Sequence, residues 1–320
     1  MNCKILSVDG SQLALDIAQI LSPKSWKEIY SVLKVDTFSD GEISPQFQES
    51  IRGKKVFLVS STTTPEKIMT LLLTIDAAKR ASAEEVILVM PYFGYSRQDR
   101  KEGRRGAIGA KLMADLLQTA GADRLVTIDL HSEQIQGFFD IPVNMIPGHI
   151  AFKPFISTLS DDCYYCVCSP DAGGVKRATR FYQRFLDRFP DANFAMLSKL
   201  RDKPNSIERM DLIGDVKGRH VIIIDDMVDT GGTLLKAVQV LRDNGACQVT
   251  AVITHGVLSG EGVNRLDDQA NGLSKLVITD SIPRANEFFK IQTVSCAKTI
   301  AKAIEAIVHS YSLDQHIEQH

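Results

Sequence analysis

Short apolar runs alternate with longer amphipathic segments along most of the chain. Residues 56–59 and 86–90 are continuous apolar runs of strand length, whereas residues 65–80 repeat Leu and Ile at helical spacing after an initial proline. The pattern continues with a helix expected over 108–119 and a strand over 125–130. Strands that alternate with helices in this way predict a parallel sheet covered by helices, which is an α/β fold.

The second half of the chain repeats this outline. Four consecutive β-branched residues begin at Val221, as expected of a buried parallel strand. A helix is expected over 233–244 with Gly245 at its C-terminal end, followed by a strand over 249–254. This unit lies about half the chain length after the one that begins at Val56. The repeat predicts two similar doubly wound parallel-sheet domains.

The boundary between the two domains is expected where proline and glycine interrupt the pattern, around residues 144–154. We therefore expect an N-terminal domain over residues 1–148 and a C-terminal domain over residues 149–320. The last expected helix, residues 295–309, could pack on either domain, and its packing on the first is one expectation. A length of 320 residues also favours two cores over one.

The composition is that of an ordinary globular protein, with 44% hydrophobic and 24% charged residues. Lys and Arg total 37 against 39 Asp and Glu, and this balance does not suggest a general nucleic-acid binder. Any anion site must therefore be built locally. The N-terminal segment lacks the basic-then-apolar order of a signal peptide, and no uncharged apolar stretch reaches roughly 18 residues. We expect a cytoplasmic protein with no membrane association.

Three of the six cysteines, Cys163, Cys166 and Cys168, lie close together in the sequence. A metal or redox role is one interpretation, although no second Cys-x-x-Cys or histidine pair completes a set of four ligands. Cys166 and Cys168 are two residues apart in a strand-like run, so they share one face of the strand. We favour the interpretation that they are small buried apolar side chains.

The most informative segment covers residues 221–233. Its apolar strand leads to the carboxyl edge of the sheet, where ligands bind in open α/β folds. Two consecutive aspartates there suit the vicinal hydroxyls of a sugar or the water shell of a metal. The glycines and threonines that follow open into a helix, so backbone N–H groups and hydroxyls can surround an anion. A tight turn before a helix explains the glycines and threonines, but it does not explain three neighbouring aspartates. The segment therefore predicts a sugar-phosphate site.

Segment 221–233 resembles the phosphoribosyl-diphosphate-binding motif that phosphoribosyltransferases share with ribose-phosphate diphosphokinases. Four further segments resemble motifs of the diphosphokinases: residues 38–42, 91–100, 129–139 and 169–174. The resemblance extends from about residue 4 to residue 310 in the same order. Neither a Walker A motif nor a G-x-G-x-x-G sequence is present.

The resemblance implies two domains of phosphoribosyltransferase type and a defined reaction. In that reaction the β,γ-diphosphoryl group of Mg-ATP is transferred to the C1 hydroxyl of ribose 5-phosphate. The products are AMP and 5-phosphoribosyl 1-diphosphate, which serves nucleotide biosynthesis. The ATP-binding residues implied are Phe38, Asp40, Gly41, Glu42, Arg97, Gln98, Asp99 and His131. The ribose 5-phosphate-binding residues implied are Arg201, Asp225, Asp226, Asp229, Thr230, Gly231, Gly232 and Thr233.

The resemblance also implies catalytic cations and a metal. Lys199 and Arg201 match the catalytic Lys and Arg of the family, which stabilise the charge that develops on the transferring group. His131 and Asp171 match the Mg²⁺ positions. We expect residues 198–203 to lie on a mobile loop. Leu200 stands where most members carry another arginine, but alternation would point its neighbours away from it, so activity is expected to survive.

The resemblance further implies a hexamer built from dimers, in which a neighbouring subunit completes the adenine pocket. Phosphate would activate the enzyme and ADP would inhibit it. The candidate allosteric residues are Arg52, Ser82, Arg104, Ser310 and Ser312. Residues 107–109 are Ala-Ile-Gly, where the family has a Pro-Ile-Thr-like step.

Simpler interpretations of some residues remain alongside these. The basic residues of 100–105 could form a solvated loop, and His131 taken alone would be a structural histidine. Phe181, Phe185 and Phe189 are spaced as one buried helix stripe.

Two other functions also remain as alternatives. A phosphoribosyltransferase would explain segment 221–233 but leaves segments 38–42 and 91–100 unused. A non-catalytic regulatory homologue would keep the fold without the activity.

Overall fold

A computed structural model describes residues 2–101, 103, 105–200, 209–284 and 288–318. The chain divides into two compact units. Unit 1 comprises Met1–Pro147, Ser281–Pro283 and Ser295–His320, and unit 2 comprises Gly148–Asp280 and Arg284–Val294. The segment at the C-terminal end of the chain therefore belongs to the same unit as the N-terminal half.

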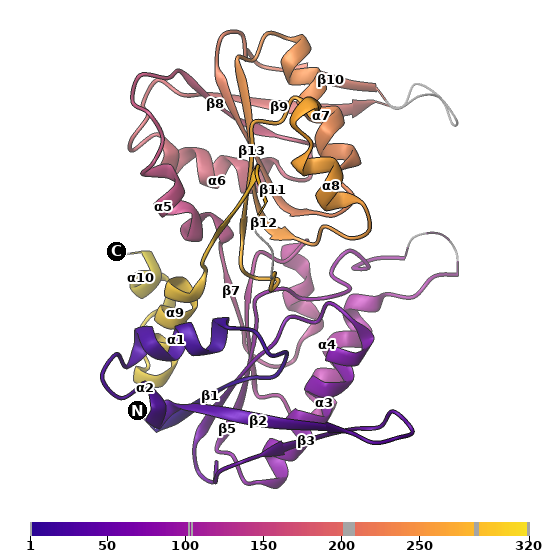
Figure 1. The fold of residues 1–320 in the computed structure, drawn as a ribbon, viewed down its shortest axis with the longest axis vertical. Helices are drawn as coiled ribbons and strands as arrows, with labels where there is room; N and C mark the ends of the chain where they lie inside the picture. The colour runs from indigo at the N-terminus through magenta and orange to yellow at the C-terminus, as the bar shows by residue number, and fades with distance from the viewer. Residues whose placement is uncertain (1, 102, 104, 201–208, 285–287, 319–320) are drawn as a thin grey trace. The chain divides into compact units, whose positions relative to one another are not determined.

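Unit 1 is built around a seven-stranded sheet in the order β3-β2-β1-β4-β5-β6-β7. All neighbouring strands pair in parallel except β2 and β3, which form an antiparallel hairpin at one edge (Figure 1). Its elements are β1 (Cys3–Ser7), α1 (Leu13–Leu21), α2 (Trp26–Ile29), β2 (Tyr30–Thr37), β3 (Ile43–Phe47), β4 (Lys55–Val59), α3 (Pro65–Arg80), β5 (Glu85–Met90), α4 (Gly109–Ala120), β6 (Arg124–Ile128), η1 (Glu133–Phe138), β7 (Val143–Ile146), α9 (Ala297–His309) and α10 (Leu313–Glu318).

Unit 2 repeats this arrangement with the strand order β10-β9-β8-β11-β12-β13-β14. Again only the edge pair, β9 and β10, is antiparallel. Its elements are η2 (Gly148–Phe152), α5 (Lys153–Ile156), β8 (Tyr165–Ser169), α6 (Val175–Phe185), β9 (Asn193–Leu200), β10 (Arg209–Ile213), β11 (His220–Val228), α7 (Gly232–Asp243), β12 (Gln248–Gly256), α8 (Gly262–Asp267), η3 (Gln269–Asn271), β13 (Lys275–Thr279) and β14 (Ile291–Val294). No helix in the described part of the chain has both the length and the apolar character that a membrane span needs.

The two units therefore have the same topology, and the prediction of two similar doubly wound α/β domains is confirmed. In each unit the first strand lies between two neighbouring strands. Beyond one neighbour lies the antiparallel edge strand, and beyond the other lie three further parallel strands. Strand β11 occupies the place in unit 2 that β4 occupies in unit 1, as the repeat at Val56 and Val221 predicts. The antiparallel edges were not anticipated. Adjacent strands that are joined by a short connection must run antiparallel, and each edge strand follows its partner directly in the sequence of elements.

Helix α3 shows how local sequence sets an element. Thr64 at the N-cap accepts a hydrogen bond from Lys67 N at 3.3 Å, and Pro65 occupies the first helical position, where no donor is needed. Lys79 and Arg80 in the last turn interact favourably with the carbonyl end of the helix. The helix covers the residues that the sequence pattern predicts.

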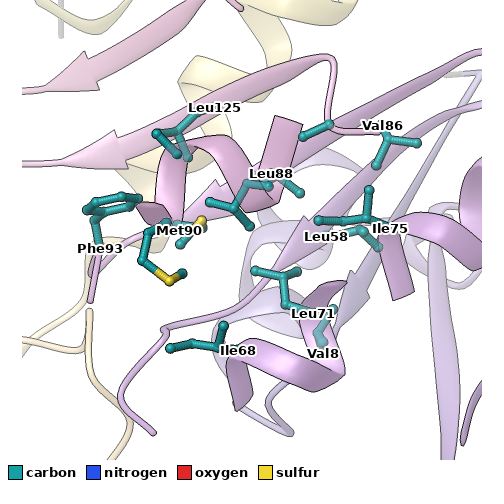
Figure 2. Packing of buried hydrophobic residues seen from close by; sticks show 14 of the residues in the cluster. Val8, Leu58, Ile68, Leu71, Ile75, Val86, Leu88, Met90, Phe93 and Leu125 are labelled. Carbon is teal, nitrogen blue, oxygen red and sulfur yellow. The ribbon is translucent and has the colours of Figure 1, made fainter. Parts of the chain in front are cut away.

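The core of unit 1 lies between its sheet and the helices α3 and α4. Figure 2 shows Leu71 and Ile75 of α3 pointing toward Leu58 and Leu88 of the sheet, and all four side chains are fully buried. Burying each such side chain contributes roughly 1.5–3 kcal/mol. On the other side of the sheet α1 packs on β1 and against α9 (Figure 1). Helices on both faces make this unit doubly wound.

Side chains along the strands of unit 2 point alternately to the two faces of the sheet, so each face has its own hydrophobic core. Cys166 and Cys168 of β8 face α7 and its neighbours, whereas Tyr165 and Val167 face α6. Both thiols are fully buried, and burial raises the pKa of Cys166 to about 12. The interpretation of these two cysteines as small buried apolar side chains is confirmed. Cys163, the third member of that group, is exposed.

The aromatic stripe on α6 is also confirmed. Phe181, Phe185 and Phe189 are buried in one cluster, and successive rings are stacked with centroids 5.6 and 4.7 Å apart. The helix ends at Phe185, so Phe189 reaches the cluster from the following turn, where its N–H donates to the Phe185 carbonyl at 2.9 Å.

Candidate active site

The acidic pair lies inside β11 rather than after it. The strand continues through both aspartates to Val228 because its pairing with β12 continues. On its other side the pairing with β8 stops at Ile223, opposite Cys168. Asp225 and Asp226 therefore project beyond the end of β8, at the carboxyl edge of the sheet.

These two carboxyls share a cation that sequence reasoning missed. Arg177 Nη1 lies 3.3 Å from Asp226 Oδ1 and 3.6 Å from Asp225 Oδ1. The pKa of the Asp225 carboxyl is raised well above its usual range, first by burial and then by the charge of Asp226, while Arg177 acts in the opposite direction. The available signal was a cation one helical turn before the aromatic stripe that begins at Phe181.

The turn from β11 into α7 has the backbone that an anion site needs. Gly231 at the N-cap has φ +78, and a Cβ there would approach the Leu266 side chain to 2.8 Å. Only glycine adopts this conformation without strain. The helix begins at Gly232, so the N–H groups of its first turn have no partner within the helix.

Neighbouring segments hold this turn in place. Asp229 Oδ1 accepts hydrogen bonds from Ser259 N, at 3.2 Å, and from the Ser259 hydroxyl. Arg265 Nη1 donates to the Thr230 carbonyl at 3.1 Å. Asp229 thus fixes the loop after β12 to the turn, in addition to any role toward a ligand.

Asp171 lies in the turn between β8 and α6. Its Oδ1 accepts from Gly174 N at 2.9 Å, and the Ser169 hydroxyl donates to its carbonyl at 2.7 Å. A Cβ at Gly174 would come within 2.9 Å of the Ser169 hydroxyl oxygen. The small residues of this turn therefore let the carboxylate sit close to backbone donors at the start of α6.

The expected mobile loop is partly a strand. Ser198, Lys199 and Leu200 form the end of β9, and Lys199 pairs with Met210 of β10. The prediction that residues 198–203 are all loop is therefore wrong at its start, because the chain returns as an antiparallel partner. Arg201 lies outside the described residues.

In unit 1, Arg97 and Gln98 line a pocket of about 220 Å³. Threonines at the end of β4 form another part of its wall, and the complete lining is Thr62, Thr63, Thr64, Pro65, Tyr92, Gly94, Tyr95, Arg97 and Gln98. The turn from β4 into α3 occupies the same topological position as the turn from β11 into α7. Sequence reasoning missed these threonines, although the topology of the two units places them at the counterpart of the turn before α7.

Gln98 is fixed against the start of α4. Its N–H donates to the Tyr95 carbonyl at 2.9 Å, and its own carbonyl accepts from Ala110 N at 3.2 Å. A Cβ at Gly109 would approach the Gln98 side-chain oxygen to 2.6 Å. A side chain at residue 109 would therefore displace the end of Gln98. Asp99, next to Gln98, is half-buried.

Phe38, Asp40, Gly41 and Glu42 form the tip of the β2–β3 hairpin. Phe38 N donates to the Glu42 carbonyl at 2.8 Å, and Glu42 N donates to Asp40 Oδ1 at 3.0 Å. Gly41 has φ +93, which closes the turn. The Phe38 ring is 57% exposed, so an apolar surface is presented at the tip of the hairpin.

His131 is exposed in the turn after β6. Asp129 in the same turn has φ +37, an unusual value for a residue other than glycine, and its N–H donates to the Ile146 carbonyl at 3.1 Å. Strained backbone of this kind concentrates at functional turns. His131 belongs to unit 1 and Asp171 to unit 2.

The candidate allosteric residues belong to unit 1. Gly53, next to the exposed Arg52, donates its N–H to the Ser82 carbonyl at 2.9 Å, so the turns before β4 and β5 are joined. Ser310 caps α9 with φ +56, and the exposed Ser312 follows. Arg104 lies outside the described residues.

Within the described residues, no three His, Cys, Asp or Glu side chains gather as a metal cage. Asp171 offers a carboxylate oxygen in unit 2 and His131 an imidazole in unit 1. Their roles as magnesium ligands remain predictions. Magnesium in phosphoryl-transfer sites keeps several waters and phosphate oxygens as ligands, so a full protein cage is not required.

Two family models match most of the chain. Residues 3–121 match the N-terminal domain of ribose phosphate pyrophosphokinase, and residues 192–317 match a phosphoribosyl synthetase-associated domain. A ribose-phosphate pyrophosphokinase of Caldanaerobacter subterraneus subsp. tengcongensis is 45% identical over 310 residues, covering 95% of this chain and 94% of that protein. One of Oceanobacillus iheyensis is 46% identical over 306 residues, covering 94% and 92%.

A solved structure agrees with these sequence matches. The crystal structure of phosphoribosylpyrophosphate synthetase from Mycobacterium smegmatis superposes with a TM-score of 0.85 at 34% identity, covering 97% of this chain and all of that one. The resemblance inferred from the motifs is confirmed, and the chain belongs to the ribose-phosphate pyrophosphokinase family.

Proposed function

We propose that this chain transfers the β,γ-diphosphoryl group of Mg-ATP to the C1 hydroxyl of ribose 5-phosphate, which yields 5-phosphoribosyl 1-diphosphate and AMP. The relatives named ribose-phosphate pyrophosphokinase support this choice of reaction, and the observation that carries its sugar-phosphate site is the junction of β11 and α7. Two carboxyls at the edge of the sheet are followed within a few residues by a glycine turn that opens a helix. A sugar with vicinal hydroxyls and a phosphate matches both features.

In this proposal ribose 5-phosphate binds with its hydroxyls on Asp225 and Asp226 and its phosphate in the turn of residues 229–233. Backbone N–H groups at the start of α7 and the threonine hydroxyls donate to the phosphate oxygens. Because the helix dipole adds to these bonds, a doubly charged phosphate is favoured there. Arg201 assists from beyond β9.

ATP binds on unit 1 in this proposal. Arg97 reaches phosphate oxygens as a bidentate donor, and Gln98 and Asp99 stand beside it. Thr63 and Thr64, exposed at the start of α3, line the same pocket and can add hydroxyl donors. Phe38 offers a ring face for adenine, and Asp40, Gly41 and Glu42 supply polar contacts at the hairpin tip.

Catalysis in this proposal depends on positioning and charge. Mg²⁺, held by ATP together with Asp171 and His131, would withdraw charge from the phosphates. Lys199 and Arg201 stabilise the negative charge that develops when the C1 oxygen attacks the β-phosphorus. Holding the two substrates in line supplies much of the remaining rate enhancement, so no strong general base is needed.

We further propose that the enzyme works in the cytoplasm as a hexamer built from dimers. An adenine stacked on Phe38 alone would keep one face in water, since that ring stands exposed on a hairpin. A neighbouring subunit would cover it. Phosphate activation and ADP inhibition would act through Arg52, Ser82, Arg104, Ser310 and Ser312, and the hydrogen bond that joins the Arg52 and Ser82 turns supports a common site.

The test is AMP formation from ATP by the purified protein with Mg²⁺, with and without ribose 5-phosphate. We expect AMP only when the sugar phosphate is present, and a loss of about two orders of magnitude or more in Lys199→Ala. Lys101→Ala, in the basic segment that this site does not use, is the matched control. No nucleobase is needed, which separates this enzyme from a phosphoribosyltransferase.

A folded protein that binds ATP but forms no AMP at any phosphate concentration would favour the non-catalytic regulatory homologue. Leu200, between the two catalytic cations, is the feature that motivates this second candidate.

A further inference from the structure

We infer that Arg177 is a positioning residue for the ribose 5-phosphate site, holding the carboxylates of Asp225 and Asp226 so that both accept from the vicinal ribose hydroxyls. This inference rests on the proposed function, because it takes the acidic pair as the receptor of the sugar. It assigns a role to a side chain of α6, outside the segment whose motif predicts the site.

The contacts place one guanidinium beside two acids. Arg177 Nη1 is 3.3 Å from Asp226 Oδ1 and 3.6 Å from Asp225 Oδ1. The Asp226 side chain is 5% exposed and that of Arg177 18%, so the ion pair is largely shielded from water. A buried carboxylate needs such a partner, because burial of an unpaired charge is strongly destabilising.

The arrangement brings together two groups that a regular strand would separate. Successive residues of a strand point to opposite faces of the sheet. Here the Asp225 carboxylate bends along the strand, and its Oδ1 accepts from Asp226 N at 2.9 Å. The same Oδ1 lies within reach of Arg177. The guanidinium therefore draws the two carboxylates toward one side, where a single sugar can meet both.

The position of Arg177 is unfavourable for the helix itself. It lies in the first turn of α6, which has no acidic residue, and Lys176 precedes it. Cations at a helix N-terminus oppose the helix dipole, whereas anions there stabilise the helix. A second cation in this turn is therefore explained by the acids it contacts and not by helix stability.

The base of Arg177 is rigidly held. The next residue, Ala178, is buried with Phe181 against Ile222 and Ile224 of β11. The turn before the helix is fixed by the hydrogen bond from Gly174 N to Asp171 Oδ1. Because α6 packs on the strand that carries the acids, the guanidinium can hold a fixed position relative to them.

The electrostatic consequence is that Arg177 favours the ionised, accepting form of Asp225 against burial and the charge of Asp226. Asp226 on the same strand favours protonation of Asp225, and Arg177 on α6 opposes it. Two ribose hydroxyls need two carboxylates that accept hydrogen bonds. Without the cation, one of the acids would take up a proton at a higher pH and would become a donor at that position.

The experiment compares Arg177→Met and Arg177→Lys with Lys176→Met, which removes a charge from the same helical turn. We expect Arg177→Met to raise KM for ribose 5-phosphate about tenfold or more while KM for ATP changes less than about twofold. We also expect the acidic limb of kcat/KM for ribose 5-phosphate to move to higher pH. Arg177→Lys should recover part of both effects, and Lys176→Met should resemble the wild type.

The outcomes separate this inference from the proposed function. A wild-type protein without activity contradicts the proposed function. An active wild type whose Arg177→Met variant keeps its KM for ribose 5-phosphate and its pH profile overturns the role of Arg177. If Arg177→Met does not fold, Arg177→Lys is measured alone and together with Asp226→Asn. A smaller increase in KM for ribose 5-phosphate from Arg177→Lys in the Asp226→Asn background than in the wild type supports positioning through the acids, and an equal increase in both backgrounds contradicts it.

Discussion

The backbone N–H of Ser61 donates a hydrogen bond to the carboxylate Oδ2 of Asp9 at 2.9 Å. The turn after β1 is thereby tied to the turn after β4, and Asp9 Oδ1 also accepts from Ser11 N at 3.0 Å. In unit 2 the topologically equivalent carboxylate is Asp171, in the turn after β8, and its Oδ1 accepts from Gly174 N within that turn. The duplicated fold thus places a carboxylate at the same sheet edge in both units. In unit 1 it joins two neighbouring turns, and in unit 2 it closes its own turn.

Replacing Asp9 should destabilise unit 1. In Asp9→Ala two backbone N–H groups lose a charged acceptor, so we expect the free energy of unfolding to fall by about 2 kcal/mol. Trp26, the single tryptophan of the chain, lies in α2 of unit 1, so its fluorescence in a urea titration reports this unit. Asp76→Ala, which removes an exposed helix ion pair, is the control and should leave the free energy of unfolding nearly unchanged. Equal losses in the two variants would contradict the bridging role of Asp9.

Filling the space at Gly109 should affect ATP selectively. A Cβ there would approach the Gln98 side-chain oxygen to 2.6 Å, and the flexible end of Gln98 can move away. In Gly109→Ala we therefore expect unfolding to change by less than about 1 kcal/mol, because alanine also favours the helix. KM for ATP should rise several-fold while KM for ribose 5-phosphate stays constant. Lys111→Ala on the same helix is the control, and an unchanged KM for ATP in Gly109→Ala would argue against Gln98 as an ATP ligand.

Acid should weaken unit 2 through His220. This residue is 8% exposed, its Nε2 lies 2.8 Å from Thr250 Oγ1, and burial lowers its pKa to about 4. In the unfolded chain its pKa is about 6.5, so the unfolded state takes up the proton first as the pH falls. This contribution to the free energy of unfolding is present above about pH 6.5 and is lost as the pH falls toward 4. The loss between pH 7 and pH 5 is about 2 kcal/mol.

The comparison is urea unfolding of the wild type and His220→Gln, followed by far-ultraviolet circular dichroism at both pH values. The wild-type transition assigned to unit 2 should move to lower urea at pH 5, and the variant should lack this part of the shift. Identical shifts in the two proteins would exclude His220 as the cause.

Thiol titration should distinguish two classes of cysteine. Cys163 and Cys247 are exposed, whereas Cys3, Cys166, Cys168 and Cys296 are buried. Burial also raises the pKa of the Cys166 thiol to about 12, so its reactive thiolate is scarce. An aromatic disulfide reagent should therefore modify two of the six thiols in the native protein and all six in denaturant. Rapid modification of Cys166 or Cys168 in the native state would reopen a redox role.

Much of the fold follows from local sequence. The apolar run at Val221, the proline that begins α3 and Gly245 after α7 act over a few residues, so their effects can be predicted without tertiary contacts. The repeat of one strand–helix–strand unit likewise predicts the duplicated topology. The residue types of segment 221–233 indicate a sugar phosphate for the same reason, since glycine, threonine and aspartate carry their chemistry wherever the turn places them.

Other features depend on which segments become neighbours. Strand β11 extends past Asp225 because β12 pairs with it, and Lys199 lies in a strand because β10 returns beside β9. Arg177 meets the acidic pair because α6 packs on β11 through buried phenylalanines. Hydrophobic burial fixes these neighbours and is not directional, so no local pattern around Arg177 names its partners. Sequence alone determined most elements and predicted the kind of ligand, and tertiary packing decided which charges lie beside the acidic pair.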